Sequence, residues 1–169
     1  MSDILPGSDT AVEEVSVDEV LVLRSTVLRP GLHLEASQYP QDNDPEAHHL
    51  AVRFGDGRVV GCATYFPDPW PGDEPPLAGP TWRLRGMATA PEVRRTGTGG
   101  VLLEAGLDLV RQEGAVLLWC NARTAALGFY ERYAFRIGAE EFYEGPLQIP
   151  HHRAWRPVND ADRAGTPRP

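Results

Sequence analysis

A turn rich in glycine and arginine is the part of this sequence best suited to chemistry. Arg94-Arg-Thr-Gly-Thr-Gly-Gly100 stands between a strand-like run, 82–88, and a helix-like run, 101–112. Glycines in such a turn let several backbone N–H groups and the helix N-terminus point at one position. The partial positive charge there, together with the guanidinium groups, favours a phosphate. The turn therefore predicts a phosphate-binding site, and the remaining question is which compound carries the phosphate.

Two familiar phosphate-binding loops do not fit this turn. The dinucleotide fingerprint G-x-G-x-x-G requires a glycine where Leu102 stands, and the next strand leads to Cys120 and Asn121 rather than to an acidic residue. The triphosphate loop requires a lysine, and all 16 basic residues of this chain are arginine. The pattern that remains is Arg94-x-x-Gly97-x-Gly99, which opens a helix after a strand.

The segments around the turn alternate between strand and helix patterns. Hydrophobic periodicity and turn residues predict strands at 14–17, 50–54, 58–66, 82–89, 115–120, 136–143 and 153–158, and helices at 20–28, 97–112 and 124–133. The segment 35–46 reads as a loop or as a short helix with a loop, and 67–80, which holds six prolines, reads as a surface loop. Strand, helix and strand around the turn require a parallel pair, while the hairpins add antiparallel strands.

Composition limits the classes of protein to consider. A length of 169 residues predicts one domain, over 13–158, with flexible tails at 1–12 and 159–169. The net charge of −8 argues against a nucleic-acid-binding protein. No apolar run approaches a membrane span, the acidic N-terminus lacks the layout of a signal peptide, and we expect a cytoplasmic protein. Cys62 and Cys120 lie in apolar runs without a metal-ligand pattern, so we expect buried free thiols and no metal.

Three further segments, together with the turn, resemble the GNAT superfamily of N-acetyltransferases. Residues 84–91 resemble the family's fourth strand, where Gly86 suits a bulge that pairs with the pantetheine arm of coenzyme A. Asn121 stands where the family's sheet splays open, and Tyr130 within 129–135 matches the tyrosine beside the coenzyme sulfur. The resemblance covers about 50–158 and is closest to small bacterial acetyltransferases of poorly assigned substrate. It implies an α/β (α+β) fold with a mixed, mostly antiparallel sheet of six to seven strands flanked by helices, with a splayed parallel pair at the cofactor site.

The same resemblance implies a set of residues that bind acetyl-CoA. These are Met87, Ala88, Thr89, Arg94, Arg95, Thr96, Gly97, Thr98, Gly99, Gly100, Asn121, Arg123 and Tyr130. The chain departs from the family in two places. The asparagine usually found seven residues before the tyrosine is Arg123 here, so that contact is open between Asn121 and Arg123. The usual Gly-Phe after the tyrosine helix is Ala134-Phe135.

The resemblance also implies an activity, which is the transfer of an acetyl group to a primary amine of a small molecule by direct attack on the thioester. A protein or peptide N-acetyltransferase and a catalytically silent acyl-CoA sensor are the alternatives. Tyr130 is the candidate acid for the leaving thiolate, and a backbone N–H near Met87–Ala88 is the candidate oxyanion donor. We expect neither nucleic acid nor a membrane as partner, and a homodimer is left open.

The base that takes the proton from the amine is less clear in the sequence. His151, which follows Pro150, is the favoured candidate because an imidazole titrates near neutrality. A water chain, Glu144 or either of His48 and His49 are the alternatives. The two adjacent histidines precede a strand, so alternation sends one ring inward, where a structural role is expected. Arg85 is a candidate to meet an acidic group of the substrate.

Overall fold

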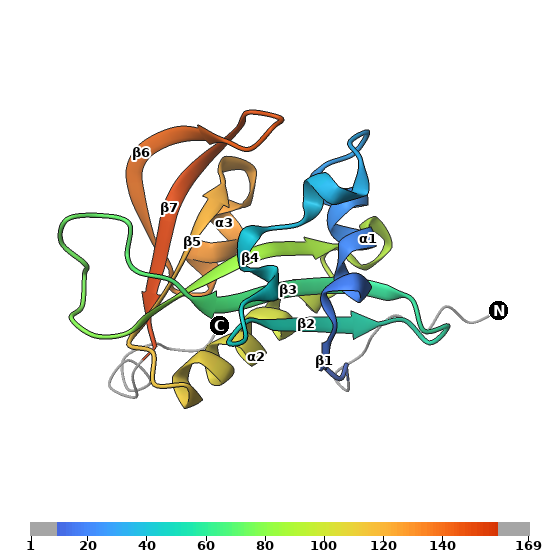
Figure 1. Ribbon diagram of the computed structural model, residues 1–169, viewed down its shortest axis with the longest axis horizontal. Coiled ribbons are helices and arrows are strands. Elements are labelled where there is room, and N and C mark those ends of the chain that lie inside the picture. The colour runs from blue at the N-terminus through green and yellow to red at the C-terminus, as the bar shows by residue number, and fades with distance from the viewer. Residues whose placement is uncertain (1–9, 159–169) are drawn as a thin grey trace. The chain divides into compact units, whose positions relative to one another are not determined.

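The computed structural model describes residues 10–158, so most of both predicted tails lies outside the described residues. Seven strands pair in the order β1-β2-β3-β4-β5-β7-β6, and β4 and β5 form a parallel pair (Figure 1). The mixed, mostly antiparallel sheet is thereby confirmed. Contacts within the chain define two compact units. The first unit holds the chain up to Phe66 and Leu84–Asp108, and the second holds Pro67–Arg83 and the chain from Leu109 onward.

The first unit contains the N-terminal elements and the predicted phosphate turn. Its elements are β1 (Glu13–Val15), α1 (Val17–Leu28), the 3-10 helices η1 (Leu34–Ser37), η2 (Pro40–Asn43) and η3 (Pro91–Val93), β2 (His48–Arg53), β3 (Val59–Pro67) up to Phe66, β4 (Thr81–Thr89) from Leu84, and α2 (Thr98–Gln112) up to Asp108. The predicted first strand ends two residues early. Ser16 begins a helix instead, because its N–H donates to Glu19 Oε2 at 2.8 Å and so satisfies a group at the helix start.

Helix α2 carries the predicted turn at its N-terminus and is held closely against β3. Leu103 and Leu107, which are four residues apart, lie on its buried face. Gly106 has no room for a side chain, since a Cβ there would clash with the Tyr65 ring. The Tyr65 hydroxyl donates to the Leu102 carbonyl at 2.9 Å. This contact fixes the helix relative to β3, and with it the turn that precedes the helix.

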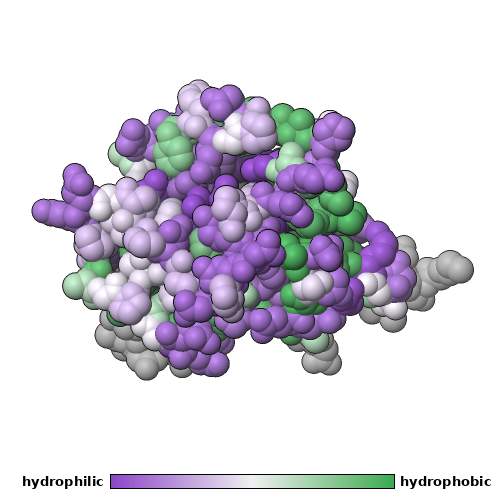
Figure 2. Space-filling view, in the orientation of Figure 1, coloured by the Kyte–Doolittle hydropathy of each residue, from purple (hydrophilic) through white to green (hydrophobic). Residues whose placement is uncertain are grey.

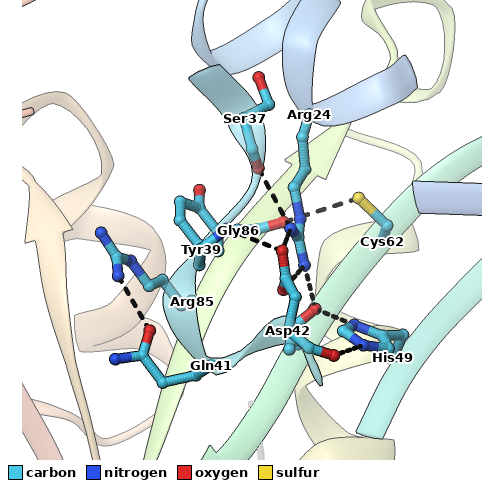
Figure 3. A network of polar contacts seen from close by, with 10 residues as sticks. Arg24, Ser37, Tyr39, Gln41, Asp42, His49, Cys62, Arg85 and Gly86 are labelled. Carbon is cyan, nitrogen blue, oxygen red and sulfur yellow. Dashed lines mark hydrogen bonds and ion pairs between the residues drawn. The ribbon is translucent and has the colours of Figure 1, made fainter. Parts of the chain in front are cut away.

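A buried ion pair ties α1 and the 3-10 helices to the strands (Figure 3). Arg24 of α1 is fully buried and donates two hydrogen bonds to the Asp42 carboxylate, at 2.8 and 3.0 Å. The same guanidinium donates to the Ser37 carbonyl and to the Thr64 hydroxyl of β3. A buried charge without a partner would cost several kcal/mol, roughly 3–5 when one member of a pair is removed. The segment 35–46, read as a loop or short helix, is therefore held in a defined conformation.

The second unit is built around β5 and its neighbours. Its elements are the first residues of β4, the last residues of α2, β5 (Leu117–Arg123), the 3-10 helix η4 (Thr124–Ala126), α3 (Leu127–Arg132), β6 (Arg136–Glu144) and β7 (Ile149–Pro157). Parallel pairing with β4 joins Thr81 to Leu117 and Arg83 to Trp119. Figure 1 shows β7 between β5 and β6, and both pairings are antiparallel.

Two predicted strand ends in this unit are wrong. The strand expected to end at Cys120 continues to Arg123, because its antiparallel pairing with β7 extends to the partner residue His151. The last strand begins at Ile149 rather than Arg153. The strand includes Pro150, and a proline is tolerated near the first residue of a strand.

The surface seen in Figure 2 and the state of the two cysteines bear on the expectations from composition. The face of the protein seen in Figure 2 is mostly hydrophilic. No helix among residues 10–158 is both long and apolar enough to cross a membrane. Cys62 and Cys120 are both free and buried, as predicted. Within the same range, no cluster of three or more histidine, cysteine or acidic residues could hold a metal ion.

Candidate active site

The predicted phosphate turn connects η3 to α2 through two residues with positive φ. Arg95 has φ 63° and Gly97 has φ 91°, so the chain reverses sharply before α2 begins at Thr98. A Cβ on Gly97 would meet no atom within 4 Å, so its backbone conformation rather than crowding by this chain favours glycine there. The Thr96 hydroxyl donates to the Val93 carbonyl at 2.6 Å and lies 2.9 Å from the Thr98 hydroxyl. These bonds fix the turn.

The start of α2 presents backbone donors. Val101 donates to the Gly97 carbonyl at 3.0 Å, whereas the N–H groups of Thr98, Gly99 and Gly100 belong to the first turn, where a helix offers no acceptor. No backbone acceptor for these three groups lies among residues 10–158. The helix has 15 residues, so its dipole adds partial positive charge at this end. An anion would satisfy these donors.

The side chains of the turn add charge to the donors. Arg94 and Arg95 are exposed, and no hydrogen bond or ion pair holds either guanidinium among the described residues. Two unpaired guanidinium groups beside a helix N-terminus suit a phosphate or pyrophosphate. The residues of the turn thus fit the phosphate end of coenzyme A.

The strand before the turn bends where the sequence predicted a bulge or a close approach. Gly86 has φ 65°, and a Cβ there would lie 2.6 Å from Arg24 Nε and 3.0 Å from the Tyr39 ring (Figure 3). The absence of a side chain at Gly86 therefore leaves room for Arg24, the arginine of the buried pair. Beyond this bend, the Ala88 N–H faces the Cys62 sulfur.

Arg85, the predicted substrate contact, lies at the edge of the same network. Its guanidinium donates to Gln41 Oε1 at 3.3 Å and lies 4.0 Å from the centre of the Tyr39 ring. Arg24 and Arg29 also face this ring, at 4.6 and 5.4 Å. The Arg85 guanidinium, which was predicted to meet an acidic group of the substrate, therefore already interacts with Gln41 and Tyr39.

Tyr130 lies in α3 of the second unit and is 7% exposed. Phe129 and Phe135 pack against its ring at 5.1 and 5.3 Å between centroids. Its hydroxyl forms a hydrogen bond with the Cys120 thiol of β5. Burial raises the pKa of the Cys120 thiol to about 12, although the bond from Tyr130 opposes that shift. The tyrosine is thus held rigidly beside β5 with its hydroxyl next to a neutral sulfur.

Asn121 is held at both ends of its carboxamide. Its Nδ2 donates to Glu144 Oε1 at 3.0 Å, and its Oδ1 accepts from Arg153 Nε at 2.8 Å. Glu144 also lies 3.6 Å from Arg83. Sequence reasoning named Asn121 and Glu144 separately but missed their connection and both arginines. Strand alternation could have placed them on one face, since Arg83 pairs with Trp119, which lies two residues before Asn121, and Asn121 pairs with Arg153.

His151 lies in β7, directly after Pro150 of the same strand, and is 9% exposed. Its Nδ1 is 2.7 Å from the Ile149 carbonyl, which can only accept, so a neutral ring carries its proton on Nδ1. The lone pair is then on Nε2, which lies 3.9 Å from Glu144 Oε2. This is the tautomer that a base acting through Nε2 requires.

The two adjacent histidines begin β2 rather than precede it. His49 is buried and bonds to the Thr64 hydroxyl at 2.8 Å and to the Asp42 carbonyl at 3.1 Å (Figure 3). Burial lowers its pKa below the ordinary value of 6.5. His48 pairs with Glu14 at 2.7 Å. The inward ring predicted by alternation is His49, and its contacts are those of a structural residue.

Comparison with known proteins identifies the family. Residues 17–135 match the model of the acetyltransferase (GNAT) family. The chain is 30% identical over 132 residues to YitI, an uncharacterised N-acetyltransferase of Bacillus subtilis (strain 168). The aligned residues cover 78% of this chain and 85% of that relative.

Solved structures share the fold. The structure of the NatC complex bound to Gag peptide and CoA matches with a TM-score of 0.68 and 15% identity, over 88% of this chain and 98% of that one. The ribosomal-protein-S18-alanine N-acetyltransferase of Escherichia coli matches with a TM-score of 0.65 and 14% identity, over 89% and 94%. The chain therefore belongs to the GNAT family of acetyltransferases and is an acyltransferase.

Proposed function

We propose that this protein is an acetyl-CoA-dependent N-acetyltransferase that acts on a primary amine of a small molecule. The observation that carries the proposal is the turn 94–100, which presents two arginines and N–H groups that have no backbone acceptor among residues 10–158, at the start of α2. In a chain of the GNAT family, these groups would bind the pyrophosphate of coenzyme A. Acetyl-CoA would supply an acetyl group activated as a thioester.

Other residues would hold the remainder of the coenzyme. The backbone of β4 at Met87–Thr89 would pair with its extended arm, in the way an added strand pairs with a sheet edge. At the end of β5, Asn121 or Arg123 would make the remaining contact. Both ends of the Asn121 carboxamide are bonded to Glu144 and Arg153.

Three groups would carry the reaction. A backbone N–H near Met87–Ala88 would stabilise the negative charge on the carbonyl oxygen. His151 Nε2 would accept the proton of the amine. The Tyr130 hydroxyl would give its proton to the departing thiolate. A phenol hydroxyl can serve as this acid because proton donation is driven by a developing anion held beside it.

Gly97→Glu tests the coenzyme site. We expect this variant to lose acetyl-CoA binding, measured by calorimetry, because it places an anion where the phosphate would lie. Gly57→Glu is the matched control, since Gly57 has φ 89° and open space around it, as Gly97 does. The control carries the same backbone strain and should bind normally. Normal binding by Gly97→Glu would refute the phosphate assignment.

Tyr130→Phe tests the acid. We expect acetyl-CoA binding to persist while turnover falls by roughly 10²–10⁴-fold, the usual contribution of a general acid. Tyr133→Phe removes a hydroxyl from the same segment and should leave turnover unchanged. The readout is release of free thiol across a panel of amines and amino-terminal peptides. Turnover of peptides alone would favour a protein acetyltransferase, and binding without any turnover would favour a sensor.

A further inference from the structure

A second cluster of charged side chains lies in the second unit, on the sheet face that carries Trp119. Arg83 and Arg153 both lie against the Trp119 ring, at 4.6 and 5.2 Å from its centroid. Asn121 and Glu144 connect them, as described above. We call these four polar residues and His151 the acceptor cluster. It has a cationic side, at the two arginines, and an anionic side, at Glu144.

The cationic side lacks a full set of acceptors. Arg83 lies 3.4 Å from Asp68 and 3.6 Å from Glu144, both at the long end of an ion pair. Among residues 10–158, no carboxylate lies within 4.0 Å of Arg153, whose Nε donates only to the neutral Asn121 carboxamide. Burial and the nearby charge of Arg83 lower the pKa of Arg153. The half-buried charge of Arg153 is therefore incompletely compensated.

Two buried N–H groups near the Trp119 ring also lack acceptors. Arg83 Nε and Trp155 Nε1 are buried and have no hydrogen-bond acceptor among the described residues. Trp155 pairs directly with Trp119 across β5 and β7, so both donors belong to the neighbourhood of that ring. A buried N–H without an acceptor is costly in a folded protein. A ligand that brings oxygen atoms to this face would supply acceptors that the described residues lack.

The anionic side suits an amine. Glu144 lies at 3.9 Å from His151 Nε2, the ring nitrogen that is unprotonated when the histidine is neutral. A carboxylate attracts an ammonium group, and an imidazole lone pair can take its proton. The single carboxamide of Asn121 spans the gap between Glu144 and Arg153. An amino group and a carboxylate separated by one carbon, as in an α-amino acid, have a comparable span.

We infer that the acceptor is an α-amino acid, whose carboxylate binds between Arg83 and Arg153 and whose amino group lies at Glu144 and His151. This inference rests on the proposed function for its chemistry, although the carboxylate site can be tested without it. The ammonium group gives one proton to His151 Nε2. The neutral nitrogen forms a bond to the carbonyl carbon and the carbon–sulfur bond breaks. The thiolate takes the proton of Tyr130, and the second proton lost by the nitrogen restores the Tyr130 hydroxyl. The products are an N-acetyl amino acid and free coenzyme.

The first experiment compares α-amino acids with their carboxamides as acceptors, at fixed acetyl-CoA. We expect kcat/KM for the acids to exceed that for the matched amides by tenfold or more, since one charge-assisted pair commonly contributes that much. Arg153→Gln should reduce this ratio by about tenfold or more. Arg136→Gln, which removes an exposed arginine of β6, is the control and should keep the ratio. Equal use of acids and amides by the wild type, or an unchanged ratio in Arg153→Gln, would overturn the inference.

The second experiment detects the carboxylate site without catalysis. Phenylacetate carries a carboxylate and no amine, and phenylacetamide is its neutral counterpart. We expect phenylacetate, and not phenylacetamide, to raise the melting temperature of the wild type and of Arg136→Gln, and to leave that of Arg153→Gln unchanged. Absence of a shift in the wild type would overturn the carboxylate site even if amines are acetylated. A shift that depends on Arg153 in a protein that acetylates no amine would preserve the site and refute the proposed function.

Discussion

At the scale of single residues, the two cysteines show how burial controls reactivity. Burial raises the pKa of both the Cys62 and the Cys120 thiol to about 12. Since the thiolate is the reactive species, both thiols should be inert in the folded protein. We expect iodoacetamide at pH 8 to label neither cysteine under native conditions and both in denaturant, as counted by mass spectrometry.

An exposed thiol calibrates that experiment. Ala125 is exposed in η4, so Ala125→Cys should label rapidly at one position while the native cysteines stay unmodified. Labelling of Cys120 at a comparable rate would show that β5 and α3 open readily. In that case Tyr130 would not be held rigidly beside the strand.

Single residues also show which parts of the candidate site the sequence could reveal. The turn at Gly97 and the bend at Gly86 could be predicted from the local sequence, because a positive φ favours glycine at that same position. Arg153 was missed because nothing near it in the sequence distinguishes it from a solvated strand arginine. Its role depends on Asn121, which is 32 residues away and meets it only through strand register.

At the scale of elements, the turn after α3 uses an unfavourable residue. Ala134 adopts φ 61°, a conformation in which an L-residue with a Cβ is strained and glycine is not. A positive φ at this position explains why the family usually has glycine there. This chain keeps the positive φ with an alanine. We expect Ala134→Gly to raise the free energy of unfolding by about 0.5–1 kcal/mol, as measured by chemical denaturation.

A control separates strain from a general effect of glycine. Ala125→Gly, in a 3-10 helix, should lower the free energy of unfolding, because glycine gains freedom in the unfolded chain and relieves no strain. A loss of stability in both variants would contradict the assignment of strain to Ala134.

The elements were predicted better than their ends. The helix over 97–112 and the strand over 82–89 were recognised because apolar spacing repeats over many residues. The ends of β5 and β7 were wrong because pairing between the two strands, rather than either sequence, sets where each stops. The register between two strands depends on both segments, so it cannot be predicted from the sequence of either strand alone.

At the scale of the whole molecule, folding stability should depend on pH through His49. The pKa of its imidazole is lowered in the folded state, chiefly by burial. As pH falls below about 6.5, the unfolded chain gains a proton at this position while the folded chain does not. Stability is therefore fully present above that pH, and it decreases as pH falls from 6.5 toward the lower folded pKa. This group contributes a slope of at most about 1.4 kcal/mol per pH unit.

His49→Gln isolates this contribution. Glutamine can donate to the Asp42 carbonyl and bond to the Thr64 hydroxyl without titrating. The net charge of −8, counted with neutral histidines, is the same in both proteins, so repulsion across the whole chain cancels in the comparison.

Because the exposed carboxylates of Glu19, Asp56 and Glu92 have lowered pKa values, measurements above pH 5 keep them ionised. We expect the wild type to lose more stability than His49→Gln between pH 7.5 and 5.5, measured by urea denaturation. Parallel curves would mean that His49 accepts a proton in the folded state, and that its bond to the Asp42 carbonyl outweighs the cost of burial.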